Sequence, residues 1–127
     1  DFKLKTTNIL QGVGMYVYEK LRSNKVLINP PQGGFYLMPE FINKKYKTSS
    51  DLCVAVLKET GVALLPGSAF GFRPNKMLVR LSFTDFDGSN FLKNISSGKK
   101  ISKMDVEKYA PNVVEGANIL SNWSKKL

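Results

Sequence analysis

A two-residue alternation of side chains is clearest between residues 77 and 83. Its apolar positions are Met77, Val79, Leu81 and Phe83. Arg80 lies among the intervening positions. Because successive side chains of a strand point to opposite faces, the pattern predicts a strand that turns its apolar set to one face and Arg80 to the other. A shorter apolar run from Val62 to Leu65, ended by Pro66-Gly67, predicts a second strand just before it.

Apolar residues at helical spacing predict a long helix near each end of the chain. The first helix is expected from Asn8 to Leu21, where Leu10, Val13, Val17 and Leu21 form the apolar stripe. The last is expected to begin near Pro111, since proline suits the first turn of a helix. Its stripe consists of Val113, Ala117, Leu120 and Trp123.

Capping-box spacing marks the start of two further helices. Thr48 and Asp51 precede a short helix that is expected to end at Gly61 and to bury Leu52, Cys53, Val56 and Leu57. Ser102 and Asp105 have the same spacing. Between these helices, a turn from Asp85 to Gly88, a short helix from Ser89 to Ile95 and a polar connection from Ser96 to Lys103 are expected. An extended run, Val26 to Ile28, follows the first helix, and Phe35 to Phe41 predicts one more strand, with Pro39 near a sheet edge.

This order of elements predicts an α+β fold with a small mixed or antiparallel sheet of about three strands, covered by helices. The 127 residues are enough for a single domain, residues 1–127. The sequence does not begin with methionine, so we expect the chain to be part of a longer protein.

The amino-acid composition excludes several kinds of functional site. The chain contains no histidine, which excludes histidine-based metal sites and serine–histidine or cysteine–histidine nucleophile pairs. Its one cysteine, Cys53, is expected to be a buried, inert thiol. The formal charge of +9 is spread over scattered lysines without interleaved aromatics, so we expect no nucleic-acid partner. No apolar run is long enough for a membrane span, and we expect a cytoplasmic protein.

Arg80 is the candidate functional residue that the strand pattern itself singles out. A guanidinium on a rigid strand presents a planar set of donors that matches a carboxylate at two points. The ordinary alternative is a surface arginine on a half-solvated sheet, which is the commoner case for a charged residue on a strand. The alternation of side chains does not decide between them.

Three linked motifs resemble the small C-terminal domain of class I/II, fold type I aminotransferases, which depend on pyridoxal phosphate. They are Pro31-Gln-Gly-Gly-Phe-Tyr-Leu-Met-Pro-Glu-Phe41, Gly61-Val-Ala-Leu-Leu-Pro-Gly-Ser-Ala-Phe-Gly71 and Val79-Arg-Leu-Ser-Phe83. The resemblance extends over roughly residues 5 to 95. It implies that Arg80 binds the α-carboxylate of an amino-acid or 2-oxo-acid substrate. It leaves Phe35 and Tyr36 either at the mouth of the active site or in a packing role, in the core or on the sheet.

The resemblance also implies partners and a cofactor. The parent enzyme would move an amino group between an amino acid and a 2-oxo acid, would be a homodimer, and would hold pyridoxal phosphate mainly through a large domain that is absent here. No lysine of this chain stands in the family's cofactor-binding motif. We therefore expect no catalytic, cofactor-binding or metal-binding residue here, and an inactive fragment in isolation. A non-enzymatic binding or interaction module with a basic surface is the alternative.

Overall fold

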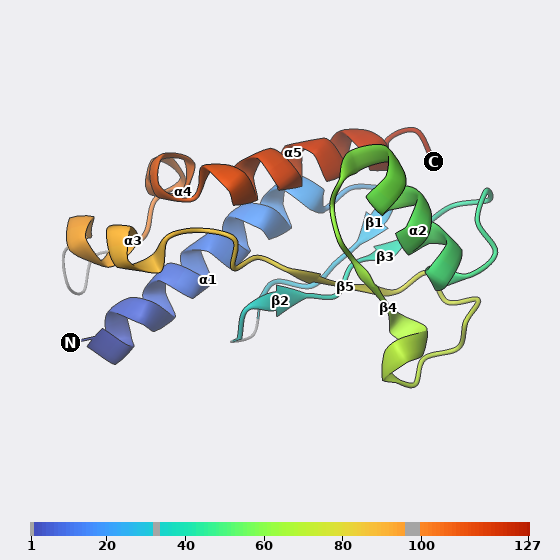
Figure 1. The fold of residues 1–127 in the computed structure, drawn as a ribbon, viewed down its shortest axis with the longest axis horizontal. Coiled ribbons are helices and arrows are strands. Elements are labelled where there is room, and N and C mark those ends of the chain that lie inside the picture. Colours follow the sequence, from blue (N-terminus) through green and yellow to red (C-terminus); the bar gives the residue numbers. More distant parts are fainter. Residues whose placement is uncertain (1, 32–33, 96–99) are drawn as a thin grey trace.

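A computed structural model describes residues 2–31, 34–95 and 100–127 of the chain. The helices are α1 (Phe2–Leu21), α2 (Ser49–Thr60), α3 (Gly88–Asn94), α4 (Lys103–Tyr109) and α5 (Pro111–Ser124), with a 3₁₀ helix η1 (Gly67–Phe70). The strands are β1 (Val26–Leu27), β2 (Tyr36–Leu37), β3 (Glu40–Phe41), β4 (Leu65–Pro66) and β5 (Val79–Ser82). Figure 1 shows α1 and α5 running along one side of the strands.

The strands form small antiparallel sheets, so the predicted α+β class is confirmed. Strands β2, β5 and β4 lie side by side in that order, with β5 in the centre, and β1 pairs with β3. The central strand falls within the stretch that the alternation predicted. All four of its predicted apolar positions are buried, whereas Arg80 is half-buried and Ser82 is exposed.

The single strand predicted from Phe35 to Phe41 is wrong, because the stretch forms β2 and β3 in different sheets. Pro39 lies between them, and proline has no N–H to donate to a ladder. Its carbonyl still accepts a hydrogen bond of 3.0 Å from the Val79 N–H. The stretch therefore follows β5 along its length, although regular pairing is interrupted at the proline.

The strand predicted from Val62 to Leu65 is displaced toward the C-terminus. Strand β4 contains Leu65 and Pro66 only, paired with Arg80 and Val79 respectively. The Val62 N–H instead donates to the Thr60 hydroxyl at 3.1 Å, a local bond that holds the chain close to the end of α2. Apolar character predicted extended backbone here, but the position of the partner strand sets where pairing begins.

The helix ends confirm most of the sequence predictions. The Thr48 hydroxyl accepts the Asp51 N–H at 3.1 Å, and Gly61 ends α2 with a φ of 79°. Ser102 and Asp105 form the predicted capping box at the start of α4. Helix α1 begins at Phe2, six residues before the predicted start at Asn8. The expected connection from Ser96 to Lys103 lies partly outside the described residues, and its last residue already begins α4.

Helix α1 packs against the ring of Phe83, the residue that directly follows β5. Val13 and Val17 of α1 are fully buried, and a Cβ built on Gly14 would lie 2.9 Å from the ring of Phe83. Close contact between the helix backbone and this ring therefore depends on the absence of a side chain at Gly14. The helical layer leaves the opposite face of the sheet, to which Arg80 belongs, without such a cover (Figure 1).

Helix α2 packs against β4, η1 and α5 and so supports the other edge of the three-stranded sheet. Its buried residues include Leu52, Cys53 and Val56, as predicted. Leu57 was also predicted to be buried, but 53% of it is exposed. The apolar face of α2 is thus narrower than the sequence indicated, and Leu57 lies at its edge.

The matched pair Leu52 and Leu57 tests this arrangement of α2. Leu52→Ala is expected to lower the free energy of unfolding of the 127-residue chain by about 2–5 kcal/mol, because Leu52 is fully buried. Leu57→Ala makes the same chemical change on the same helix and should cost less than about 1 kcal/mol. Urea unfolding followed by circular dichroism measures both. Equal losses would contradict the observed orientation of α2.

Candidate functional site

Arg80 lies at the centre of the three-stranded sheet, on the face that the helices leave open. It is directly opposite Leu65 of β4, while Tyr36 of β2 is opposite the next outward-facing residue, Ser82. Directly paired residues share one face of a sheet. Val79 and Leu81, on either side of Arg80 in sequence, point to the buried face. Hydrogen bonding on both edges of β5 thus fixes the backbone position of Arg80, from which its side chain extends.

Two aromatic rings contact the Arg80 guanidinium. Its Cζ atom is 4.9 Å from the centre of the Tyr36 ring and 4.6 Å from the centre of the Phe70 ring. These are cation–π distances, at which the electron-rich face of a ring attracts a guanidinium. Tyr36 belongs to β2, which flanks β5 on one side, and Phe70 belongs to η1, which directly follows β4 on the other side.

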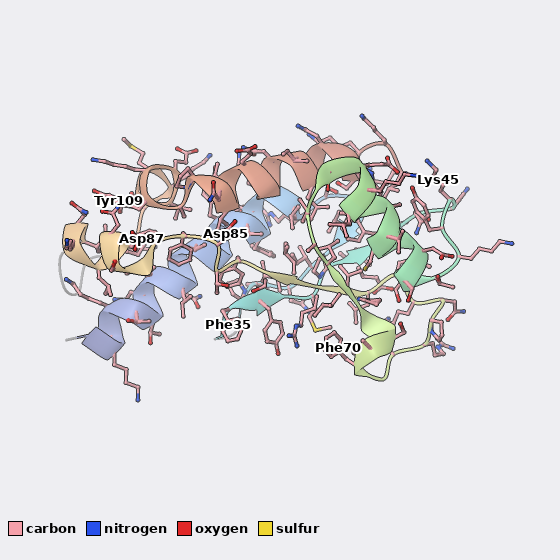
Figure 2. All side chains as sticks on the ribbon, in the orientation of Figure 1. Phe35, Lys45, Phe70, Asp85, Asp87 and Tyr109 are labelled. Atoms are coloured by element: carbon pink, nitrogen blue, oxygen red, sulfur yellow. The ribbon has the colours of Figure 1, made fainter. Side chains whose placement is uncertain are left out.

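These rings lie at the surface rather than in the core. Tyr36 and Phe70 are each 41% exposed, and Phe35 is 50% exposed. Figure 2 shows Phe35 and Phe70 on the side of the sheet away from α5. Of the positions that the sequence left open for Phe35 and Tyr36, only burial in the core is wrong, because both side chains are exposed. Tyr36 lies in the sheet, paired with Ser82. The surrounding surface is apolar and aromatic, with one cation at its centre.

The Arg80 guanidinium forms no ion pair or hydrogen bond with any residue that the structure describes. Lys76 differs in this respect, since its Nζ lies 3.4 Å from a Glu40 carboxylate oxygen. A guanidinium has five N–H donors in one plane and remains charged at physiological pH. This arrangement can bind a planar anion such as a carboxylate at two points.

The 3₁₀ helix that carries Phe70 is held against β5 by a glycine. The Gly67 N–H donates to the Leu78 carbonyl at 2.7 Å, and a Cβ on Gly67 would lie 2.6 Å from that oxygen. No residue with a side chain fits there without displacing the backbone. Gly71 then ends the turn with a φ of 95°, a left-handed conformation that favours glycine. Glycines thus determine how closely Phe70 approaches Arg80.

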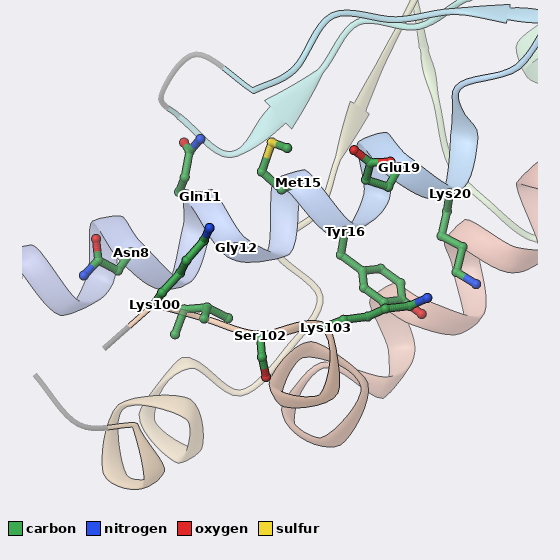
Figure 3. Close-up of a pocket in the computed structure, with 11 residues that line it drawn as sticks. Asn8, Gln11, Gly12, Met15, Tyr16, Glu19, Lys20, Lys100, Ser102 and Lys103 are labelled. Carbon is green, nitrogen blue, oxygen red and sulfur yellow. The ribbon is translucent and has the colours of Figure 1, made fainter. Parts of the chain in front are cut away.

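A separate cleft of about 800 Å³ lies between α1 and the residues that lead into α4 (Figure 3). Its most buried polar group is Tyr16, whose hydroxyl donates to a Glu107 carboxylate oxygen at 3.1 Å. Burial, together with this carboxylate, raises the pKa of Tyr16 to about 12. The phenol therefore stays protonated near neutral pH. No residue that the sequence singled out for function lines this cleft.

Pyridoxal phosphate forms its covalent bond with a lysine side chain, so the burial of the described lysines bears on where it could bind. No described lysine is buried, although the lysine that reacts with this cofactor needs a pKa lowered by burial.

No cluster of three or more potential metal ligands occurs among the described residues. Cys53 is buried, and burial raises the pKa of its thiol to about 11, as expected of an inert cysteine.

Asp87 has a structural role in the turn that the sequence predicted. One of its carboxylate oxygens accepts the Ser89 N–H at 3.1 Å and the Asn90 N–H at 3.2 Å, and so caps α3. Hydrogen bonds from Ser89 and Asn90 lower the pKa of this carboxyl group.

Within the described residues, no helix is both long enough and apolar enough to cross a membrane.

Comparison with known proteins finds aminotransferases by sequence. The chain is 37% identical over 71 residues to an aspartate aminotransferase of Sulfolobus acidocaldarius, a match over 53% of this chain and 18% of that protein. It is 43% identical over 68 residues to a probable N-acetyl-LL-diaminopimelate aminotransferase of Bacillus subtilis, which covers 54% of this chain and 17% of that protein. No family model matches the chain.

The fold gives the same result. It is similar to an alanine aminotransferase of Pyrococcus furiosus, with a TM-score of 0.67 and 18% identity, over 93% of this chain and 24% of that one. The chain thus spans less than a quarter of the length of the proteins it matches. The predicted resemblance to aminotransferases is confirmed, and these coverages are consistent with a fragment of such an enzyme.

Proposed function

We propose that this chain is the C-terminal small domain of a pyridoxal-phosphate-dependent aminotransferase and that Arg80 binds the α-carboxylate of its substrate. The observation that supports this most is the Arg80 guanidinium itself. It is half-buried at the centre of the sheet, and its donors have no acceptor among the described residues. The fold around it is similar to that of aminotransferases.

Arg80 would act by binding and orienting the substrate. Two parallel hydrogen bonds from a guanidinium to a carboxylate fix both the position and the plane of that carboxylate. The rings of Tyr36 and Phe70 lie against the guanidinium, and such apolar surface strengthens the bonds by keeping water away from them. The amino group of the substrate would then point away from Arg80, toward the rest of the enzyme.

The remaining parts of the parent enzyme lie outside this chain. Pyridoxal phosphate supplies the electron sink for amino-group transfer, and a large domain of the same polypeptide would hold it. The parent is proposed to be a cytoplasmic homodimer that uses an amino acid and a 2-oxo acid. The matched proteins differ in their named substrates, so the side chain that the parent selects stays open.

Substitution of Arg80 in the full-length enzyme tests the proposed contact. Arg80→Lys keeps the charge but removes the planar set of donors, so kcat/KM for an amino acid should fall about ten- to a hundredfold. The assay measures kcat/KM for two substrates. One is the common amino acid that the full-length enzyme turns over fastest, and the other is the amine made by removing its α-carboxylate. The amine should lose less than about threefold, because it never contacts Arg80.

Arg73 offers the matched control for this experiment. It is an exposed arginine in the loop before β5, without a ring contact to either Tyr36 or Phe70 among the described residues. Arg73→Lys should leave kcat/KM for both substrates unchanged. Equal losses for amino acid and amine in Arg80→Lys would assign Arg80 a structural role, and no loss for either would make it an ordinary surface arginine.

The cofactor assignment predicts that the 127-residue chain alone does not bind pyridoxal phosphate covalently at a specific lysine. The reason is that no described lysine is buried. After incubation with the cofactor and reduction by borohydride, mass spectrometry should find only substoichiometric labelling spread over several lysines. One lysine labelled stoichiometrically would contradict the assignment of cofactor binding to the large domain.

A further inference from the structure

The two rings beside Arg80 have a role that the proposed carboxylate contact leaves unexplained. We propose that Tyr36 and Phe70 are positioning residues, which hold the Arg80 guanidinium in the orientation that binds a carboxylate. This inference rests on the proposed function of Arg80. It is carried by the two short distances, 4.9 and 4.6 Å, from the guanidinium carbon to the ring centres.

A long side chain without a fixed partner needs such support. Arginine has several rotatable bonds, and a binding site loses affinity when it must order them on each encounter. Ion pairs with acidic residues are one way to hold an arginine, but no such pair involves Arg80 among the described residues. Contacts with the faces of Tyr36 and Phe70 limit the rotamers of Arg80 before the substrate arrives.

Aromatic rings also leave the donors of the guanidinium available. An aspartate or glutamate neighbour would occupy two of its N–H groups and neutralise its charge, and would then compete with a substrate carboxylate. A ring face attracts the cation through its quadrupole and accepts no conventional hydrogen bond. Tyr36 and Phe70 can therefore restrain Arg80 without reducing what it offers to an anion.

The backbone fixes each ring independently of the other. Tyr36 is held by the pairing of β2 with β5 and by an edge contact with the Phe35 ring, whose centre is 6.1 Å away. Phe70 is held by η1, which Gly67 brings close to the Leu78 carbonyl. Because the rings come from opposite neighbours of β5, either can be changed while the other stays in place.

Phe72 provides a matched control for Phe70. The two phenylalanines lie two residues apart, and they are 40% and 41% exposed. Of these two phenylalanines, only Phe70 has a described ring contact with the Arg80 guanidinium. If the loss of apolar surface caused the effect, substitution of Phe70 and of Phe72 would lower activity alike. If the orientation of Arg80 is what matters, only substitution of Phe70 would lower it.

The experiment compares substitutions in the full-length enzyme, using the common amino acid that it turns over fastest and the corresponding amine without the α-carboxylate. Phe70→Leu and Tyr36→Leu should each lower kcat/KM for the amino acid about three- to tenfold. The amine should change less than about twofold, since it does not use Arg80. Phe70→Tyr and Tyr36→Phe keep a ring and should stay within about twofold of wild type for both substrates.

The control Phe72→Leu should leave the ratio of the two kcat/KM values unchanged. Equal losses for amino acid and amine, or the same selective loss in Phe72→Leu, would overturn the positioning role. Arg80→Lys in the same assay separates the two proposals. A carboxylate-selective loss in Arg80→Lys without one in Phe70→Leu and Tyr36→Leu would refute the positioning role alone. No selective loss in Arg80→Lys would refute the proposed function itself.

Discussion

The pairing of β5 with a strand on each side is the constraint on which the rest of the structure depends. One face of this strand buries Val79 and Leu81 in the core, and the other face carries Arg80. Side chains alternate along a strand, so a slip of one residue in register would expose the two apolar residues and bury the charge. The free energy of burying the core therefore also determines which face Arg80 occupies.

The uneven cover of the sheet connects this constraint to the proposed function. Helices close one face, while the other keeps an apolar surface with Tyr36 and Phe70 around a single guanidinium (Figures 1 and 2). An exposed aromatic surface is uncommon on a protein without a binding role. Here the rings lower the hydration of Arg80 without neutralising it. The same face thus combines a cation with apolar surface, which suits the proposed binding of an amino acid or 2-oxo acid.

The sequence predicted what local chemistry controls. The side-chain alternation around Arg80 and the cap at Thr48 follow from neighbours within a few residues, and both were confirmed. The break at Pro39 and the exposure of Leu57 were not predicted, because each depends on which distant element packs alongside. The contacts of Arg80 with two aromatic rings could not be predicted from the sequence for the same reason. They join residues 36, 70 and 80, whose proximity depends on the register of three strands.

A crystal structure of the full-length enzyme with a stable substrate analogue tests the central claim most directly. N-(5′-phosphopyridoxyl)-L-alanine is suitable, because it carries an α-carboxylate and cannot react. We expect both carboxylate oxygens about 2.7–2.9 Å from guanidinium nitrogens of Arg80, with the rings of Tyr36 and Phe70 still against the guanidinium. A carboxylate held by other residues, with Arg80 beyond hydrogen-bonding distance, would contradict the account.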